Sequence, residues 1–156
     1  MKDLKGKVAI VTGSSSGVGA ATARLFASLG CHVVINYNAN SAGAEQVMQD
    51  CEALGVETLC FGGSVANDSD CEAMVRAAME KWGRVDILVN NAGTTKFVDH
   101  NKLDGLDAED FQRIYGVNVI GLFLVVEFLL FLFANLYSFG QGVIPVIDFN
   151  NFFLLI

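Results

Sequence analysis

The chain carries little positive charge and lacks the usual spacing of metal-binding or paired cysteines. Its 156 residues include 10 Lys and Arg against 17 Asp and Glu, which gives a formal net charge of −7. Nucleic-acid binding needs clustered basic residues, so this composition argues against a nucleic-acid partner and favours a small molecule. The cysteines show no CxxC spacing and no nearby pair of histidines: Cys31, Cys51, Cys60 and Cys71. We therefore predict no metal site, reduced thiols and a cytoplasmic location.

Signals for secretion and for a second domain are also missing. The N-terminal residues MKDLKGKVAIVTG lead directly into an apolar run, with no hydrophobic signal region and no small-residue cleavage site. No repeat or low-complexity linker interrupts the chain, and its length suits one hydrophobic core. We expect a single dinucleotide-binding domain over residues 1–156, for the reasons that follow.

Basic residues are absent from the C-terminal part of the chain. All ten lie at or before Arg113, and the residues after it include only Glu127 and Asp148 as charged side chains. From about residue 120 the sequence becomes rich in Phe and Leu. Residues 122–156 therefore form an atypical apolar segment, unlike the ordinary α/β pattern before them.

Apolar strand-like runs alternate with helix-like segments in the first part of the chain. The runs at residues 8–12, 31–37, 56–63 and 85–93 predict buried parallel strands. The segments at residues 21–30, 41–55 and 68–83 predict helices, with N-caps at Ser41 and at Asp68 or Ser69. A further helix is expected to begin at Asp107. This alternation predicts an α/β fold, a doubly wound parallel sheet of Rossmann-like type, with an incomplete C-terminal part.

The turn between the first strand and the first helix reads TGSSSGVG, residues 12–19. Gly13 would permit the tight turn, Gly17 would let backbone N–H groups approach a pyrophosphate, and Gly19 would let the helix pack close to the strand. A tight turn without a ligand is the alternative. The position of the turn within a βαβ unit favours a dinucleotide site.

Two further motifs lie downstream, NNAG at residues 90–93 and Asn118 in YGVNVIG. Together with Thr12 and the glycine-rich turn, they make residues 4–121 resemble the short-chain dehydrogenase/reductase family, in particular its 3-oxoacyl-[acyl-carrier-protein] reductase and sugar or alcohol dehydrogenase branch. The resemblance implies an NAD(P)-dependent oxidoreductase acting on a small-molecule carbonyl or alcohol. We also expect a homo-oligomer, because the apolar helix after residue 120 would rarely stay exposed on a soluble monomer, and we expect no membrane partner.

The resemblance also implies which residues bind the cofactor. Those of the glycine-rich turn would line its pyrophosphate and nicotinamide, those of NNAG would pass its ribose, and two after the third strand would lie beside the adenine. In chain order the expected residues are Gly13, Ser15, Ser16, Gly17, Val18, Gly19, Asn38, Ser64, Val65, Asn91, Ala92 and Gly93. Ser64 departs from the Asp that the family usually has there.

The end of the second strand bears on the choice between NADP and NAD. An acidic residue there would accept hydrogen bonds from the ribose 2′-OH and favour NAD, and none is present. Asn36, Tyr37 and Asn38 could surround a 2′-phosphate with neutral donors instead. We therefore favour NADP over NAD.

Of the catalytic residues that the family uses, this sequence matches one. The resemblance implies a Tyr acid, a Lys that lowers its pKa, a Ser and an Asn, and Asn118 matches the Asn. Neither Tyr115 nor Tyr137 has Lys four residues on, and the strand-like run at residues 140–151 ends without Ser. We predict negligible reductase activity for this polypeptide. A silent nucleotide-binding fragment and an association or regulatory partner are the alternatives.

Three interpretations of the apolar segment remain open. It is an altered end of an ordinary dehydrogenase, a membrane segment at residues 128–147, or the family's interface helix followed by a buried strand. We favour the first, combined with the third for residues 119–134, since the second lacks basic flanking residues and contains Gly and Pro.

Overall fold

The computed structural model describes residues 4–99, 101, 102, 104–138 and 153–155, of which 132–138 and 153–155 are described by their backbone alone. Five parallel strands form one sheet in the order β3-β2-β1-β4-β5. The strands are β1 (Val8–Val11), β2 (His32–Tyr37), β3 (Thr58–Gly62), β4 (Ile87–Val89) and β5 (Phe153–Leu155). This sheet confirms the predicted Rossmann-like α/β fold.

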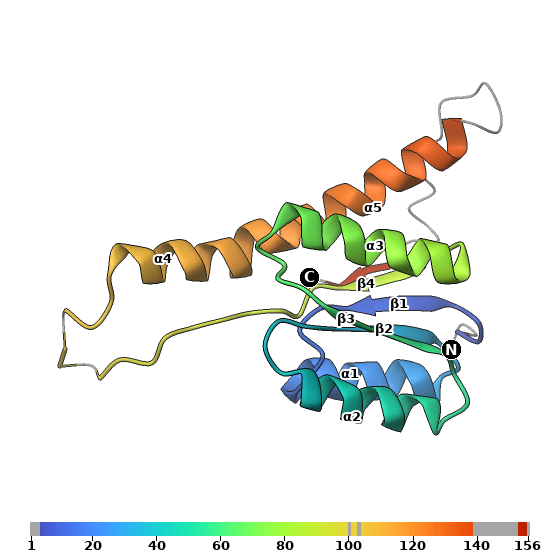
Figure 1. Cartoon of the computed structure of the whole chain (residues 1–156), viewed down its shortest axis with the longest axis horizontal. Coiled ribbons are helices and arrows are strands. Elements are labelled where there is room, and N and C mark those ends of the chain that lie inside the picture. The colour runs from blue at the N-terminus through green and yellow to red at the C-terminus, as the bar shows by residue number, and fades with distance from the viewer. Residues whose placement is uncertain (1–3, 100, 103, 139–152, 156) are drawn as a thin grey trace.

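Helices cover both faces of the sheet (Figure 1). One face carries α1 (Gly17–Ser28) and α2 (Ser41–Glu52), and the other carries α3 (Asp68–Trp82) and α5 (Gly121–Ser138). The helix α4 (Ala108–Tyr115) continues into α5 through the π-helical turn η1 (Gly116–Ile120) and extends beyond the sheet.

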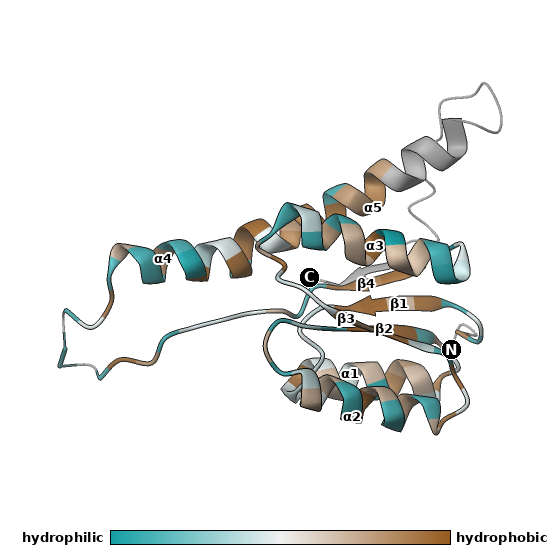
Figure 2. Ribbon diagram, in the orientation of Figure 1, coloured by the Kyte–Doolittle hydropathy of each residue, from teal (hydrophilic) through white to brown (hydrophobic). Residues whose placement is uncertain are grey.

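The strands form because their side chains are apolar on both faces. In β1, Ala9 and Val11 pack into the core cluster on the α1 and α2 side, whereas Ile10 packs into the cluster on the α3 and α5 side. All four β1 residues are fully buried. Figure 2 shows the same arrangement, with apolar strands between helices that carry both polar and apolar residues. A central parallel strand covered on both faces needs this continuous apolar run.

Two of the three predicted helix N-caps are wrong by one residue or more. Asn40 caps α2, because its Oδ1 accepts from the Gly43 N–H at 3.1 Å, so Ser41 is the first helical residue. Asn67 caps α3 in the same way, ahead of both candidates at residues 68 and 69. Asp107 is confirmed as the cap of α4, where it forms a capping box with Asp110. Each correct cap is the residue whose non-helical backbone lets its side chain turn back to the first free N–H groups.

The apolar C-terminal segment begins as a helix that packs on the sheet. Leu124, Val125 and Leu129 of α5 are buried in the cluster formed with α3. The helical stretch Ala108–Phe131 is also long and apolar enough to cross a membrane, but some core helices of soluble proteins are as well. Residues 140–151, where a strand was expected, lie outside the described residues. So do residues 139–147 of the segment that was considered as a membrane span. On the side of β4 away from β1, the paired strand is β5 (Phe153–Leu155).

Candidate functional site

A cavity of about 460 Å³ opens at the carboxyl ends of the strands, where the loops after β1, β2, β3 and β4 meet the junction of α4 and η1. In open α/β sheets, ligands bind in the crevice outside these strand ends. Nine predicted site residues line the cavity: Gly13, Ser15, Ser16, Asn38, Ser64, Val65, Asn91, Ala92 and Gly93. Eight others also line it. Two of them, Asn36 and Tyr37, were expected near a 2′-phosphate, and six were not predicted: Ala39, Asn40, Gly63, Thr94, Arg113 and Val117.

The remaining predicted cofactor residues lie in the first turn of α1, next to the cavity. Gly17 begins the helix with φ +55°, and a Cβ added to it would meet no atom within 4 Å. Val18 is 76 % exposed. A Cβ on Gly19 would lie 2.4 Å from Asn91 Nδ2, so this glycine serves close packing. The turn thus leaves open space at Gly17 and none at Gly19.

Thr12 joins the glycine-rich turn to NNAG. Its Oγ1 accepts from the backbone N–H groups of Asn91 and Ala92, both at 3.0 Å, and donates to Val89 O at 3.3 Å. The Asn91 amide in turn donates to the carbonyls of Thr12 at 2.9 Å and Gly13 at 3.1 Å. The two sequence motifs are therefore one hydrogen-bonded unit, in which the Asn91 amide serves the backbone.

Gly13 lies where the glycine-rich turn approaches the backbone of NNAG. Its φ is +62°, and an added Cβ would lie 2.7 Å from Ala92 Cα. Both the left-handed backbone and the close approach require glycine at this position.

The end of β2 corrects one detail of the cofactor prediction. Asn36 Oδ1 accepts from the Gly13 N–H at 3.0 Å, and its Nδ2 donates to Gly63 O at 3.0 Å and to Phe61 O at 3.4 Å. Because both amide hydrogens are bonded to backbone carbonyls, the expectation that Asn36 offers a donor to a 2′-phosphate is wrong. Tyr37 and Asn38 remain at the cavity.

Asn118 lies in the π-helical turn, and its side-chain amide is hydrogen-bonded to the backbone of Thr94, which follows NNAG. Its Oδ1 accepts from the Thr94 N–H at 2.8 Å, and its Nδ2 donates to Thr94 O at 3.0 Å. It lines a smaller cavity of about 50 Å³ beside the main one, together with Asn90, whose Nδ2 is buried and has no partner among the described residues. The structure therefore places Asn118 next to the main cavity and not in its lining.

One charged side chain lines the main cavity. Arg113 donates to Thr94 Oγ1 at 3.0 Å and to Asp110 Oδ1 at 3.3 Å. The hydrogen bond from Lys96 is the largest influence on Asp110 and lowers its pKa to about 2. The other lining residues are neutral. The cavity therefore suits an anionic ligand that pairs with Arg113 and accepts hydrogen bonds from the neutral donors. Within the described part of the chain, no three His, Cys, Asp or Glu residues are grouped to hold a metal ion.

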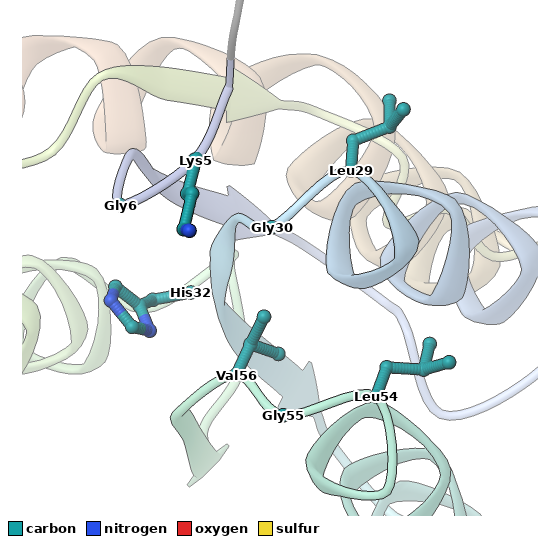
Figure 3. A pocket seen from close by; sticks show the side chains of 8 residues that line it. All are labelled: Lys5, Gly6, Leu29, Gly30, His32, Leu54, Gly55 and Val56. Atoms are coloured by element: carbon teal, nitrogen blue, oxygen red, sulfur yellow. The ribbon is translucent and has the colours of Figure 1, made fainter.

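A second cavity, also of about 460 Å³, lies at the amino end of the strands and contains none of the predicted residues (Figure 3). Leu29, Leu54 and Val56 give it an apolar lining. His32 also lines this cavity, but its side chain already makes structural contacts. Its Nδ1 accepts from the Glu57 N–H at 3.0 Å, and its ring stacks on the indole of Trp82 at the end of α3. Size does not separate the two cavities. Position at the carboxyl strand ends and convergent polar groups favour the first.

A glycine-rich strand-to-helix turn beside such a cavity defines the class of dinucleotide-binding α/β proteins. The family model described as short chain dehydrogenase matches residues 7–145. The chain therefore belongs to the short-chain dehydrogenase/reductase family of NAD(P)-dependent oxidoreductases, as the motifs predicted.

Relatives of known sequence and structure agree with this assignment. A 3-oxoacyl-[acyl-carrier-protein] reductase from Synechocystis sp. is 37% identical over 127 residues, covering 81% of this chain and 50% of the relative. An uncharacterized oxidoreductase from Methylorubrum extorquens is 38% identical over the same length and with the same coverage. A short chain dehydrogenase from Burkholderia cenocepacia, solved in complex with NADP, is similar with a TM-score of 0.76 and 34% identity over 81% of this chain and 51% of that one. The chain thus spans about half the length of the relatives it matches.

Proposed function

We propose that this chain binds NADP(H) in the cavity at the carboxyl ends of β1 to β4. The observation that carries the proposal is the turn before α1, which the Thr12 network holds rigidly while leaving open space at Gly17. The first N–H groups of a helix lack helical partners and attract anions. Ser16, the N-cap residue, makes no capping hydrogen bond with its side chain, so its hydroxyl is available to a pyrophosphate.

The remaining residues are assigned by their place around the cavity. Ser15 and Ser16 would donate to the pyrophosphate, and the exposed Val18 would pack against the nicotinamide. The backbone of residues 91–93 would pass the nicotinamide ribose, and Ser64 with Val65 would flank the adenine. A cavity of about 460 Å³ with this mixture of polar groups and open turn suits part of a dinucleotide, with the rest lying over α1.

NADP is preferred over NAD because no carboxylate lines the cavity at the end of β2. A carboxylate there would repel a 2′-phosphate, whereas Tyr37, Asn38 and Asn40 present neutral polar groups. The NADP complex of the Burkholderia cenocepacia relative supports the same choice. Tighter binding of NADH than of NADPH in a calorimetric titration would overturn it.

Hydride transfer is a separate matter from binding. In the family, bound nicotinamide exchanges a hydride with a carbonyl or alcohol carbon, while protein groups move the proton on the oxygen. Of those groups this chain offers Asn118, whose amide is occupied with Thr94, and none of its tyrosines is followed by Lys four residues on. We infer that the 156-residue polypeptide binds the cofactor and leaves carbonyl substrates unreduced.

The test separates the two parts. Calorimetry of the purified polypeptide with NADPH should give one site per chain, and a Gly17→Trp variant, which fills the open space at the turn, should give none. Oxidation of NADPH with a panel of ketones should not exceed the rate of the variant. Turnover by the wild type that the substitution abolishes would refute the inference that the chain is inactive, and no binding would refute the proposed function.

Self-association is the second proposal, and one surface supports it. Phe111, Tyr115 and Phe123 project from one helical stretch and are 58 to 61 % exposed, which is unusual for aromatic side chains of a monomer. A second copy of the chain would cover them. Light scattering should give a dimer or larger oligomer for the wild type and a smaller species for Phe123→Ser. A wild type that remains monomeric at tens of micromolar would contradict the proposal.

A further inference from the structure

One buried amide, that of Asn36, contacts two segments around the candidate cofactor site. Asn36 is 3 % exposed near the end of β2. Its side chain accepts from Gly13 of the glycine-rich turn and donates to Phe61 and Gly63 at the end of β3. The turn after β1 and the end of β3 are therefore joined through a single side chain of β2.

The backbone of Asn36 makes a second set of bonds to the same turn. Its N–H donates to Ser14 Oγ at 3.0 Å, and its carbonyl accepts from the Ser14 N–H at 2.8 Å. The fully buried Ser14 hydroxyl in turn donates to Val11 O at 2.7 Å. Both consecutive residues at the start of the turn, Gly13 and Ser14, are thus bonded to Asn36.

This arrangement needs one acceptor and two donors in one small side chain. An amide supplies both, whereas an ionised carboxylate would turn an acceptor toward the carbonyl oxygens of residues 61 and 63. Alanine would leave the partly buried Gly13 N–H without its partner, at the cost of an unsatisfied polar group. Asn36 therefore fits its surroundings through its hydrogen bonds and not through its size alone.

We propose that Asn36 is a positioning residue for the cofactor, which fixes the glycine-rich turn at the distance from the end of β3 that a bound pyrophosphate requires. The proposal rests on the proposed cofactor site. It assigns Asn36 to the part of the ligand that NADPH and NADH share. A ligand of the 2′-phosphate, in contrast, would affect NADPH alone.

The experiment compares Asn36→Ala with Asn38→Ala, a neighbour that lines the cavity, by calorimetry with NADPH and NADH. Asn36→Ala should weaken both cofactors by the same factor, about tenfold or more, because the turn is displaced for either ligand. Asn38→Ala should weaken NADPH more than NADH. A loss confined to NADPH in Asn36→Ala, or affinities equal to those of the wild type, would refute the positioning role.

A pH series with Asn36→Asp adds a signature that a general loss of stability would not give. The ionised carboxylate cannot donate to Gly63 O, but the protonated acid can, and burial favours the protonated form. The affinity of this variant for NADH should therefore recover as the pH falls from 8 to 5, while that of the wild type stays flat. A flat profile for the variant would refute the proposal, even where Asn36→Ala fails to fold. A wild type that binds neither cofactor would refute the proposed function itself.

Discussion

Two glycines that both have a left-handed backbone but lie at different ends of the sheet test the cofactor site in depth. Gly17 has φ +55° and Gly55 has φ +85°, and an added Cβ meets no atom within 4 Å at either one. Alanine in the left-handed region costs about 1–2 kcal/mol. For a chain of this size, that corresponds to a fall in Tm of about 2–8 °C. Gly17→Ala and Gly55→Ala should therefore lose similar stability without ligand.

Cofactor should separate the two variants. At a free concentration of about 100 times its Kd, a ligand stabilises the native state by about 2.7 kcal/mol. The Gly17→Ala methyl group occupies the open space that the pyrophosphate would approach, so NADPH should no longer raise its Tm. Gly55→Ala lies at the other end of the sheet and should keep the full shift.

The assay is thermal unfolding followed by circular dichroism, with and without NADPH. Gly13→Ala serves as the steric comparison, because its added Cβ would lie 2.7 Å from Ala92 Cα. It should lose more stability than the other two even without ligand. Equal stabilisation of Gly17→Ala and Gly55→Ala by NADPH would refute the reasoning.

Three further predictions concern the network, the pH dependence and the thiols. Thr12→Val removes the acceptor of two buried N–H groups, Asn91 included, and should cost about 1–3 kcal/mol in urea unfolding, whereas an unchanged midpoint would contradict the network. Burial raises the pKa of Asp86, but hydrogen bonds led by that from Arg84 outweigh it and hold the pKa below its usual value. Because the folded-state pKa is lowered, the stabilisation is present above about pH 4 and lost as the pH falls through the folded value, so Asp86→Asn should show a shallower loss of stability as the pH falls below about 4. Cys60 is the partly exposed thiol and should react first with a disulfide reagent, and the three buried cysteines, whose pKa burial raises to about 11, should react only on unfolding.

The sequence predicts the fold well because its strongest signals are local. The run VAIV is apolar on both faces, and β1 accordingly lies at the centre of the sheet with every residue buried. Helix starts are less predictable, since Asn40 and Ser41 are both capping residue types and the backbone angles decide between them.

The details of the site depend on contacts that no local pattern reveals. Asn36 reads as a polar residue at a strand end, equally suited to bind a ligand or the backbone. Its partners Gly13 and Gly63 lie 23 and 27 residues away, so only the folded chain shows which role its amide takes. Arg113 likewise reads as part of a charged helix start, and its place at the cavity follows from where α4 joins η1.

The most direct test of the cofactor site is the mapping of amide shifts in ¹⁵N-labelled protein during titration with NADPH. Binding in the cavity at the carboxyl strand ends predicts saturable shifts for Gly13, Gly17 and Gly93, with little change at Gly30 and Gly55. Shifts confined to the cavity of Gly30 and Gly55 at the amino end of the sheet, or no saturable shifts at all, would contradict the account.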